Sequence, residues 1–383
     1  MNITIELQPC LNDKSGIGIY TYELVKCLQH YENLNMTGTL FNFLNRKNVE
    51  ASVRGLDFKK KICRLLPYRY YCTLWDYIPI KYSYLFKREA DITHFFNFIV
   101  PPYVKGKVIS CIHDISFLLY PETMDAVTLQ RIRKNIVRSV ECSDKIITIS
   151  QNTKKDLIET LKVPREKIEI IYPGVDQEKF NRVYSTIEKI MVRKKYNLPD
   201  IYMLYMGTLE PRKNIESIIQ AFNLYNQKNS NSRQTIKLVI AGKKGWLYES
   251  IFKQVESLGL QEYVIFTNYI DEEDKPLLYQ MASVFVFPSL YEGFGIPVLE
   301  AMASGTPVIT SNTSSLPEVV GDAAILVDPV DIETIARAMQ KCIAREGDIK
   351  ELINKGYKRA QLFSWDASAE KLYQLYRNLM EEC

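Results

Sequence analysis

Two glutamates, Glu292 and Glu300, lie eight residues apart in the stretch YEGFGIPVLEAMASGTPVI (291–309). Paired carboxylates can act as acid and nucleophile in the cleavage of a glycosidic bond. The same pair can instead hold two parts of one ligand, or it can simply place negative charge near the start of a helix. Residue types and spacing alone leave these three possibilities open.

The residues around the two glutamates predict how a fold would present them. The apolar run SVFVFPS (283–289) is typical of a strand, so Glu292 is expected in the loop at its carboxyl end. Pro297 suits the first position of a helix, Glu300 is then expected in the first helical turn, and Gly305 at the helix end. Both carboxylates are therefore expected to point into one cleft above the sheet edge.

Two cations, Arg212 and Lys213, follow the expected strand YMLYMG in the motif GTLEPRKN (207–214). At the start of a helix they oppose the helix dipole, which is unfavourable unless an anion lies nearby. A diphosphate would supply that anion, and a solvated basic pair is the alternative. The chain lacks GxxxxGK[ST], so this is not a Walker phosphate loop.

A glycine pair, Gly16 and Gly18, precedes an amphipathic segment after the first expected strand. Glycines let a backbone approach an anion at a helix N-terminus. Thr21 stands where the dinucleotide fingerprint has its third glycine, so a plain glycine turn is the alternative.

One histidine, His113, comes at the carboxyl end of an expected strand in CIHDISF (111–117). Ligands of open α/β sheets bind at such ends. The alternative is a structural histidine, with Asp114 as a helix cap.

The segment FKKKICRLLPYRYYCTLWDYIPIKYSYLFKR (58–88) interleaves cations with aromatic side chains and contains a single acid, Asp76. Such a composition suits a membrane interface or an anionic lipid-linked ligand. The alternative is a solvated, partly core-facing helical region. Nucleic acid is the lesser option, because no known nucleic-acid module accompanies the segment.

Apolar runs alternate with amphipathic segments along the chain, which predicts doubly wound α/β domains with parallel strands. The second half carries expected strands at 202–207, 235–242, 263–268, 283–289, 306–311 and 323–329. The first half carries them less regularly, at 2–7, 39–44, 91–96, 107–112, 144–150 and 167–173. The polar stretch 173–182 suits a linker, and the two sheets are expected to face each other across a cleft.

Composition excludes several classes of protein. The 383 residues are 46% hydrophobic and 25% charged, as in soluble globular proteins of two or three domains. Eight scattered cysteines without a CxxC, and three histidines, argue against a zinc site and a secreted disulfide framework. Because neither a signal peptide nor a membrane-spanning run is visible, a cytoplasmic location is expected.

The motifs, in this order and at these strand ends, resemble the retaining glycosyltransferases of family four, which have the GT-B fold of two Rossmann-like domains. The most specific is the glutamate, seven residues, glutamate pattern of Glu292 and Glu300; GTLEPRKN also matches. SGIGIYTYEL and IHDISFLLYPE look most like bacterial mannosyltransferases acting on surface polysaccharides. The resemblance implies an acceptor-side domain at 1–175, a nucleotide-sugar domain at 176–362, and a C-terminal helix in 363–383 that returns to the first domain.

The resemblance also implies roles for the residues of the motifs. Glu300 is expected to bind the ribose hydroxyls of the donor, and Glu292 the hydroxyls of the transferred sugar. Arg212 and Lys213 are expected to bind the diphosphate, and His113 to face the sugar near its 6-hydroxyl. The other donor-binding positions implied are Gly16, Gly18, Gly242, Lys243, Tyr269, Ile270, Gly293, Phe294 and Gly295.

A glutamate assigned to ribose cannot be half of a glycosidase couple, so the resemblance implies a front-face displacement with retention. Some family members carry a second arginine where this chain has Thr208, so phosphate neutralisation rests more heavily on Arg212 and Lys213. The chain has no DxD motif, and we therefore expect metal-independent transfer without a cofactor.

The leading hypothesis is an α-mannosyltransferase that uses GDP-mannose and a glycan or lipid-linked glycan acceptor at the inner face of the cell membrane, with residues 58–88 as the membrane contact. A transferase that uses a UDP-sugar is the alternative of the same class. A nucleotide-sugar epimerase and a non-catalytic sugar-nucleotide-binding protein are alternatives of other classes.

Overall fold

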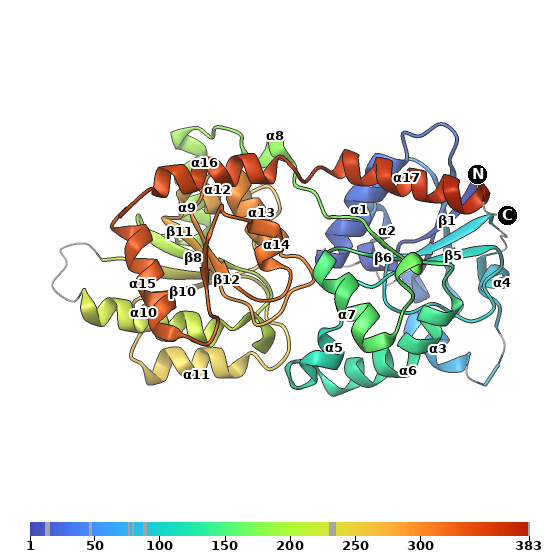
Figure 1. Cartoon of the computed structure of the whole chain (residues 1–383), viewed down its shortest axis with the longest axis horizontal. Coiled ribbons are helices and arrows are strands. Elements are labelled where there is room, and N and C mark those ends of the chain that lie inside the picture. The colour runs from blue at the N-terminus through green and yellow to red at the C-terminus, as the bar shows by residue number, and fades with distance from the viewer. Residues whose placement is uncertain are drawn as a thin grey trace. The chain divides into compact units, whose positions relative to one another are not determined.

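A computed structural model describes residues 1–11, 16–45, 48–75, 77–78, 80–86, 90–229 and 235–381, apart from the side chain of residue 45 (Figure 1). The chain forms two compact units. The first consists of Met1–Ile115, Val127–Gly174 and Ser364–Cys383, and the second of Ser116–Ala126 and Val175–Phe363.

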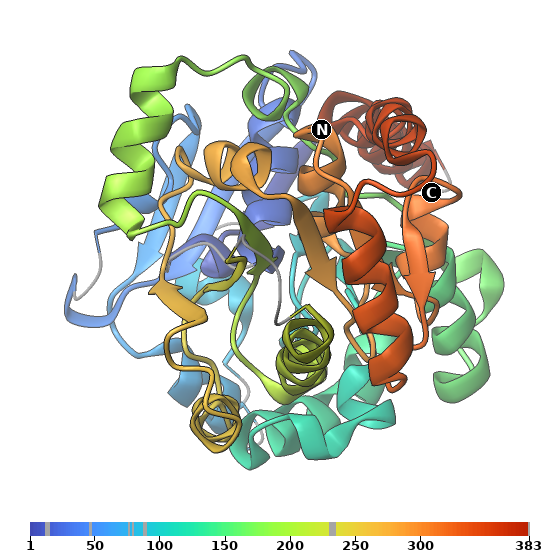
Figure 2. The same ribbon diagram turned by 90° about the vertical axis from the view of Figure 1, so that its left-hand side faces the viewer.

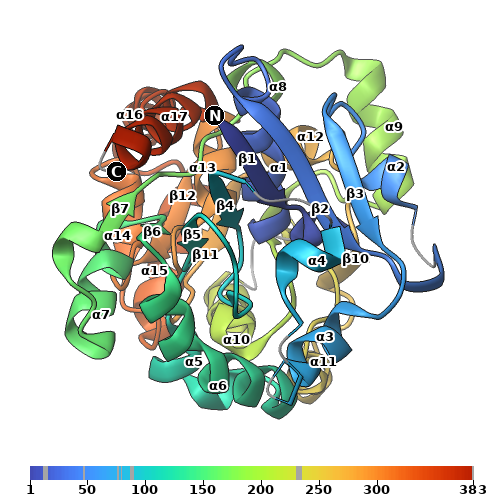
Figure 3. The same cartoon turned by 90° about the vertical axis from the view of Figure 1, so that its right-hand side faces the viewer.

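The first unit contains a seven-stranded parallel sheet in the order β3-β2-β1-β4-β5-β6-β7 (Figure 3). Its strands are β1 (Asn2–Glu6), β2 (Asn35–Phe41), β3 (Lys59–Cys63), β4 (Ile92–Phe95), β5 (Lys107–Cys111), β6 (Lys145–Thr148) and β7 (Ile168–Ile170). The strand order reverses between β1 and β4. Such a switch point is where doubly wound sheets bind ligands at the carboxyl ends of their strands.

Helices cover both faces of the first sheet: α1 (Gly16–Leu28), α2 (Val49–Ser52), α3 (Tyr68–Leu74), α4 (Tyr82–Phe86), α6 (Ala126–Cys142), α7 (Gln151–Leu161) and α17 (Trp365–Glu381). The C-terminal helix α17 packs against α1, and the Tyr31 and Tyr373 rings stack beside this contact at 4.5 Å. On α4, Tyr82 places its hydroxyl 2.7 Å from Thr39 Oγ1.

Two expectations for the first unit were right only in part. The expected strand at 39–44 begins earlier, at Asn35, and ends at Phe41. Within 58–88, the helices α3 and α4 agree with the helical alternative, which missed β3, whose Lys59 and Lys61 flank Lys60 at the edge of the sheet. Lysines are common on edge strands, because they discourage further strand pairing, so the charge did not prevent a strand here.

The second unit contains a six-stranded parallel sheet in the order β10-β9-β8-β11-β12-β13 (Figure 2). All six expected strands are confirmed, as β8 (Tyr202–Met206), β9 (Lys237–Ala241), β10 (Val264–Asn268), β11 (Val284–Phe287), β12 (Val308–Ser311) and β13 (Ile325–Val327). The side chains of β8 and β11 are buried throughout, as continuous apolar runs predict.

Two helical layers enclose this sheet (Figures 1 and 2). One layer holds α10 (Ile215–Lys228), α11 (Glu249–Ser257) and α15 (Ile332–Ile343). The other holds α9 (Thr186–Tyr196), α12 (Lys275–Met281), α13 (Ile296–Ala303) and α16 (Ile349–Ala360). Shorter helices are α5 (Ser116–Leu119), α8 (Gln177–Phe180) and α14 (Leu316–Val320). Among the described helices, none is both long and apolar enough to cross a membrane.

Candidate functional site

Two loops at the carboxyl edge of the second sheet bring Arg212, Lys213 and Glu292 together. The loop after β8 contains the short 3-10 helix Pro211–Lys213, and Leu290 N in the loop after β11 donates to Arg212 O at 2.9 Å. Lys213 Nζ lies 2.6 Å from Glu292 Oε1, and Arg212 Nη1 lies 3.1 Å from Glu292 Oε2. The Glu292 carboxylate therefore has one cation on each oxygen.

The other arm of the Arg212 guanidinium contacts a residue that sequence reasoning missed. Arg212 Nη2 donates to Glu210 Oε1 at 2.7 Å, and Arg212 Nη1 also donates to the carbonyl oxygen of Tyr291 at 2.6 Å. The anions expected near the two cations are thus supplied in part by the chain itself, through Glu210 and Glu292. Glu210 is part of GTLEPRKN. A glutamate that precedes a proline is typical of a turn, so the sequence did not indicate a role for Glu210 in the site.

Burial sets the electrostatics of this cluster. The side chains of Glu292, Arg212 and Lys213 are only 8%, 15% and 13% exposed. Burial acts to raise the pKa of Glu292, but the charges of Lys213 and Arg212 oppose it and lower that pKa to about 2. Glu292 is therefore ionised at neutral pH, which suits a hydrogen-bond acceptor and not a general acid.

The loop after β11 is held in a tight turn. Gly295 has φ +110°, and a Cβ there would lie 2.7 Å from Leu316 Cδ2. Both the backbone conformation and this contact therefore disfavour a side chain at this position. Ser315 Oγ donates to the carbonyl oxygens of Glu292 and Phe294 at 2.8 and 3.0 Å. Gly293, between Glu292 and Phe294, belongs to the same turn.

Glu300 has a different set of partners. The prediction that it lies in the first turn of the helix was wrong, because α13 begins at Ile296 and Glu300 is its fifth residue. Tyr279 on α12 donates to Glu300 Oε2 at 2.9 Å. Burial raises the pKa of Glu300, and the positive charge of Lys275 acts in the opposite direction. Within the described part of the chain, Glu292 and Glu300 share no hydrogen-bond partner.

Asn214 is a second residue that sequence reasoning missed. It adopts the left-handed conformation with φ 58° and precedes α10 as its N-cap residue. Its side-chain amide donates to the carbonyl oxygens of Pro288 and Pro329 at 2.9 and 2.7 Å. This amide ties the loop after β8 to the loops after β11 and β13, and thereby fixes the neighbouring Lys213.

The candidate base-binding residues follow β9 and β10. Gly242 has φ +148°, and a Cβ there would collide with the carbonyl oxygen of Gly207, so this position requires glycine. Lys243 Nζ lies 4.4 Å from the centre of the Tyr269 ring, which is 38% exposed, and Ile270 is buried. The structure thus brings Lys243 and Tyr269 together at the edge of the sheet.

The remaining candidates belong to the first unit. His113 is buried, and its Nε2 lies 2.8 Å from the carbonyl oxygen of Phe96, which requires Nε2 to carry the proton. Burial lowers the pKa of His113, which is therefore neutral, and its ring meets Tyr20 edge-on at 5.3 Å. Gly16 begins α1 with open space around it, and Gly18 is buried within α1.

Comparisons with known proteins cover most of the chain. A family model described as "Glycosyl transferases group 1" matches residues 186–359, and one described as "Glycosyltransferase Family 4" matches residues 14–179. The chain is 31% identical to O-antigen chain mannosyltransferase B of Escherichia coli, over 99% of this chain and all of that protein. It is 33% identical to the serotype-specific mannosyltransferase WbdA of Escherichia coli, over 73% of this chain but only 34% of that protein.

Among solved structures, the chain is similar to sucrose-phosphate synthase from Thermosynechococcus elongatus. The TM-score is 0.78, and the match covers the whole of both chains at 23% identity. At this level of identity the likeness establishes the fold and does not extend to the substrates.

Proposed function

Because the chain belongs to glycosyltransferase family 4 and has the GT-B fold, we propose that it transfers mannose from GDP-mannose to a glycan acceptor in the assembly of a surface polysaccharide. The observation that carries this proposal is the end-to-end likeness to O-antigen chain mannosyltransferase B. Mannose is favoured over glucose because the long matches among curated relatives include several mannosyltransferases.

Arg212 and Lys213 are the proposed partners of the donor diphosphate. Within the chain their charges are balanced by Glu210 and Glu292. When the bond between sugar and phosphate breaks, negative charge grows on the leaving diphosphate, and fixed cations in a buried site stabilise that charge. The protein then needs no carboxylate nucleophile, and the departing phosphate can take the proton of the acceptor hydroxyl.

The two glutamates are proposed to hold opposite ends of the donor. Glu292, ionised and fixed between two cations, accepts hydrogen bonds from hydroxyls of the transferred sugar, beside the turn Gly293, Phe294 and Gly295. Glu300 accepts from the ribose hydroxyls, with Tyr279 fixing the other side of its carboxylate. Glu292 and Glu300 contact different residues, which supports separate binding roles for the two carboxylates and disfavours their action as a paired acid and base.

The other donor contacts remain proposals on the same basis. Lys243, Tyr269 and Ile270, with the glycine turn at Gly242, form the proposed surface for the base. From the first unit, Gly16 and Gly18 at the start of α1 and the neutral His113 are proposed to approach the diphosphate and the sugar. Because His113 Nε2 donates to Phe96 O, the other ring nitrogen of the neutral imidazole, Nδ1, is a hydrogen-bond acceptor.

Calorimetric titration with GDP-mannose, GDP, UDP-glucose and UDP tests the donor. Tight binding of GDP and GDP-mannose, with transfer of mannose to a mannoside acceptor seen by mass spectrometry, is the expected result. Binding of the uridine nucleotides alone would establish the UDP-sugar alternative. Interconversion of free sugar nucleotides without an acceptor would establish an epimerase.

A surface of the first unit is proposed to contact an anionic lipid membrane. Between residues 64 and 84, large apolar side chains are exposed, namely Leu65 at 80%, Tyr70 at 62%, Tyr77 at 80%, Ile78 at 53% and Tyr84 at 68%. Arg64 and Arg69 are exposed in the same segment. Exposed aromatic and aliphatic groups beside cations fit the boundary between lipid headgroups and chains, which would bring the enzyme to a lipid-linked acceptor.

A further inference from the structure

A buried carboxylic acid, Glu6, ends β1, an inner strand of the first unit's sheet. Its side chain is buried, with the residue 3% exposed, and Glu6 Oε1 accepts a hydrogen bond from Gln8 N at 3.1 Å. Glu6 Oε2 is also buried and has no hydrogen-bond partner among the described residues. An unpartnered buried polar atom is costly and uncommon in native proteins, so this oxygen needs an explanation.

The protonation state of Glu6 follows from its surroundings. Burial raises the pKa of Glu6 from 4.5 to about 8, and the hydrogen bond from Gln8 offsets only part of that effect. Glu6 is therefore a neutral acid at pH 7. A protonated carboxyl can both donate and accept a hydrogen bond, as a sugar hydroxyl can, so the two groups are complementary.

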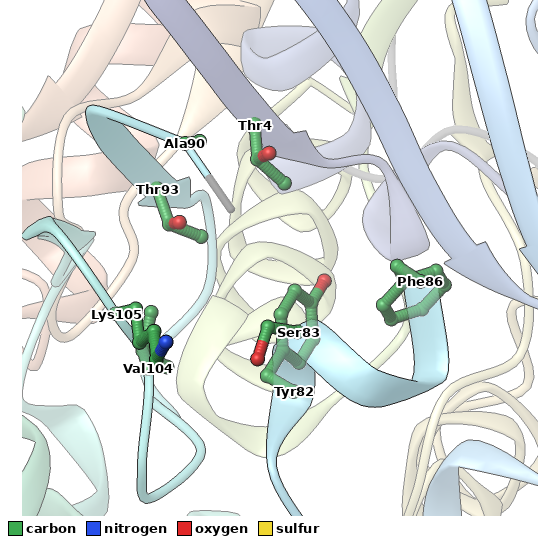
Figure 4. A pocket seen from close by; sticks show the side chains of 8 residues that line it. All are labelled: Thr4, Tyr82, Ser83, Phe86, Ala90, Thr93, Val104 and Lys105. Carbon is green, nitrogen blue, oxygen red and sulfur yellow. The ribbon is translucent and has the colours of Figure 1, made fainter. Parts of the chain in front are cut away.

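One other unpartnered polar atom of the first unit, Ser83 Oγ, has a simpler explanation. Ser83 Oγ lines a cavity of about 10 Å³ together with Thr4, Thr93 and Lys105 (Figure 4). A space of this size suits one water molecule bound to hydroxyl groups. Glu6 does not line this cavity, so a water there would leave Glu6 Oε2 unpartnered.

The position of Glu6 is that of a ligand-binding residue. It lies at the carboxyl end of β1, beside the switch point between β1 and β4, where doubly wound sheets bind their ligands. Burial is the main cause that raises the pKa of Tyr68 and the pKa of Tyr82. The charge of Glu6 contributes to both shifts, so both phenols lie near Glu6. Gln8, whose N–H donates to Glu6, and Tyr68 are partly exposed, so Glu6 has partly exposed neighbours at this edge.

We propose that Glu6 determines acceptor specificity by hydrogen bonding, through Oε2, to a hydroxyl group of the glycan acceptor. The inference rests on the proposed function, in which the second unit holds the donor and leaves the acceptor to the first. A site built to hydrogen-bond a hydroxyl group rejects an acceptor that lacks it, because the buried acid is then left unpaired.

Steady-state transfer to an octyl α-mannobioside at saturating donor tests the role of Glu6. The variants are Glu6→Gln, which keeps the shape but exchanges the acid for an amide, and Glu6→Leu, which removes both polar atoms. Thr37→Val is the matched control, because Thr37 Oγ1 is equally buried and unpartnered on the same sheet but lies in mid-strand. Donor binding by calorimetry and thermal unfolding are measured on each protein.

The expected result is a fall in kcat/KM for the acceptor of roughly 10- to 100-fold in Glu6→Leu and a smaller fall in Glu6→Gln, whose amide still donates and accepts, with donor affinity unchanged. Thr37→Val should keep the wild-type acceptor kinetics. Wild-type acceptor kinetics in Glu6→Leu, or an equal loss in Thr37→Val, would overturn the inference. Failure of the wild-type chain to transfer sugar from any donor would instead overturn the proposed function.

Discussion

Lys213 Nζ and Glu292 Oε1 lie 2.6 Å apart, and both side chains are largely buried. Arg212 lies on the second oxygen and also donates to Glu210, so the cluster sets two cations against two carboxylates. A diphosphate that binds here adds negative charge beside cations that are fixed in advance, so little reorganisation is needed as charge develops on the leaving group.

Replacement of Lys213 by methionine should reduce kcat for mannose transfer by roughly 100- to 1000-fold, the usual effect of removing one fixed group that stabilises transition-state charge. The matched control is Lys355→Met on α16, where the lysine pairs with Asp322 and Glu351 but is 40% exposed. Initial rates with saturating donor and acceptor measure the effect. Equal rates for the two variants would show that Lys213 has no part in the chemistry.

The ion cluster should also make stability depend on acidic pH. The folded-state pKa of Glu292 is about 2, below the 4.5 of the unfolded chain, so its contribution is complete above pH 4.5 and is lost as the pH falls toward 2. Between pH 6 and pH 3 the wild type should lose about 2 kcal/mol relative to Glu292→Gln, which cannot titrate. Urea unfolding of both proteins at the two pH values measures this difference. If the difference in the free energy of unfolding between the wild type and Glu292→Gln is the same at both pH values, the lowered pKa of Glu292 is contradicted.

The sequence predicted the second unit better than the first. Its strands are continuous apolar runs buried on both faces, and all six were found, whereas β3 was missed because three lysines conceal an edge strand. The ion cluster could be predicted only in part. Glu292 and Arg212 are 80 residues apart, and they meet because β8 and β11 are neighbours in the sheet, which the order of elements along the chain does not determine.

The variant Tyr279→Phe tests whether the Tyr279 hydroxyl positions the Glu300 carboxylate for donor binding. The substitution removes the hydroxyl that donates to Glu300 Oε2 at 2.9 Å, so the carboxylate loses one of its fixed contacts and the proposed ribose contact weakens. We expect a rise in the dissociation constant for GDP-mannose of about tenfold, near the lower end of what a hydrogen bond to a charged group contributes. Tyr202→Phe is the control, since that buried hydroxyl donates only to Leu278 O, at 2.7 Å. Similar donor affinities in both variants would count against the role of Tyr279.

Removal of divalent metal should leave transfer unchanged. Arg212 and Lys213 place two cationic hydrogen-bond donors at the proposed diphosphate position, and such donors can stabilise a leaving diphosphate without a divalent ion. Initial rates in excess EDTA should therefore equal those in added Mg²⁺ or Mn²⁺. A strict requirement for either ion would refute this prediction and would assign charge neutralisation to a bound metal.

Vesicle binding tests the surface between residues 64 and 84. The wild type should sediment with phosphatidylglycerol vesicles more strongly than with neutral phosphatidylcholine, and added salt should weaken the binding, because each cation near an anionic surface contributes about 1 kcal/mol. Leu65→Ser with Tyr77→Ser should abolish most of this binding while leaving transfer to a soluble acceptor intact.

The control for that experiment is Val183→Ser with Val330→Ser, which changes two apolar side chains of the second unit that are 91% and 70% exposed. These substitutions remove a similar kind of exposed apolar group but belong to the other unit, outside the segment that contains Arg64 and Arg69, so vesicle binding should persist. If both double variants lose binding equally, general surface hydrophobicity is responsible and the segment has no special role. If neither does, the enzyme reaches its acceptor without this surface.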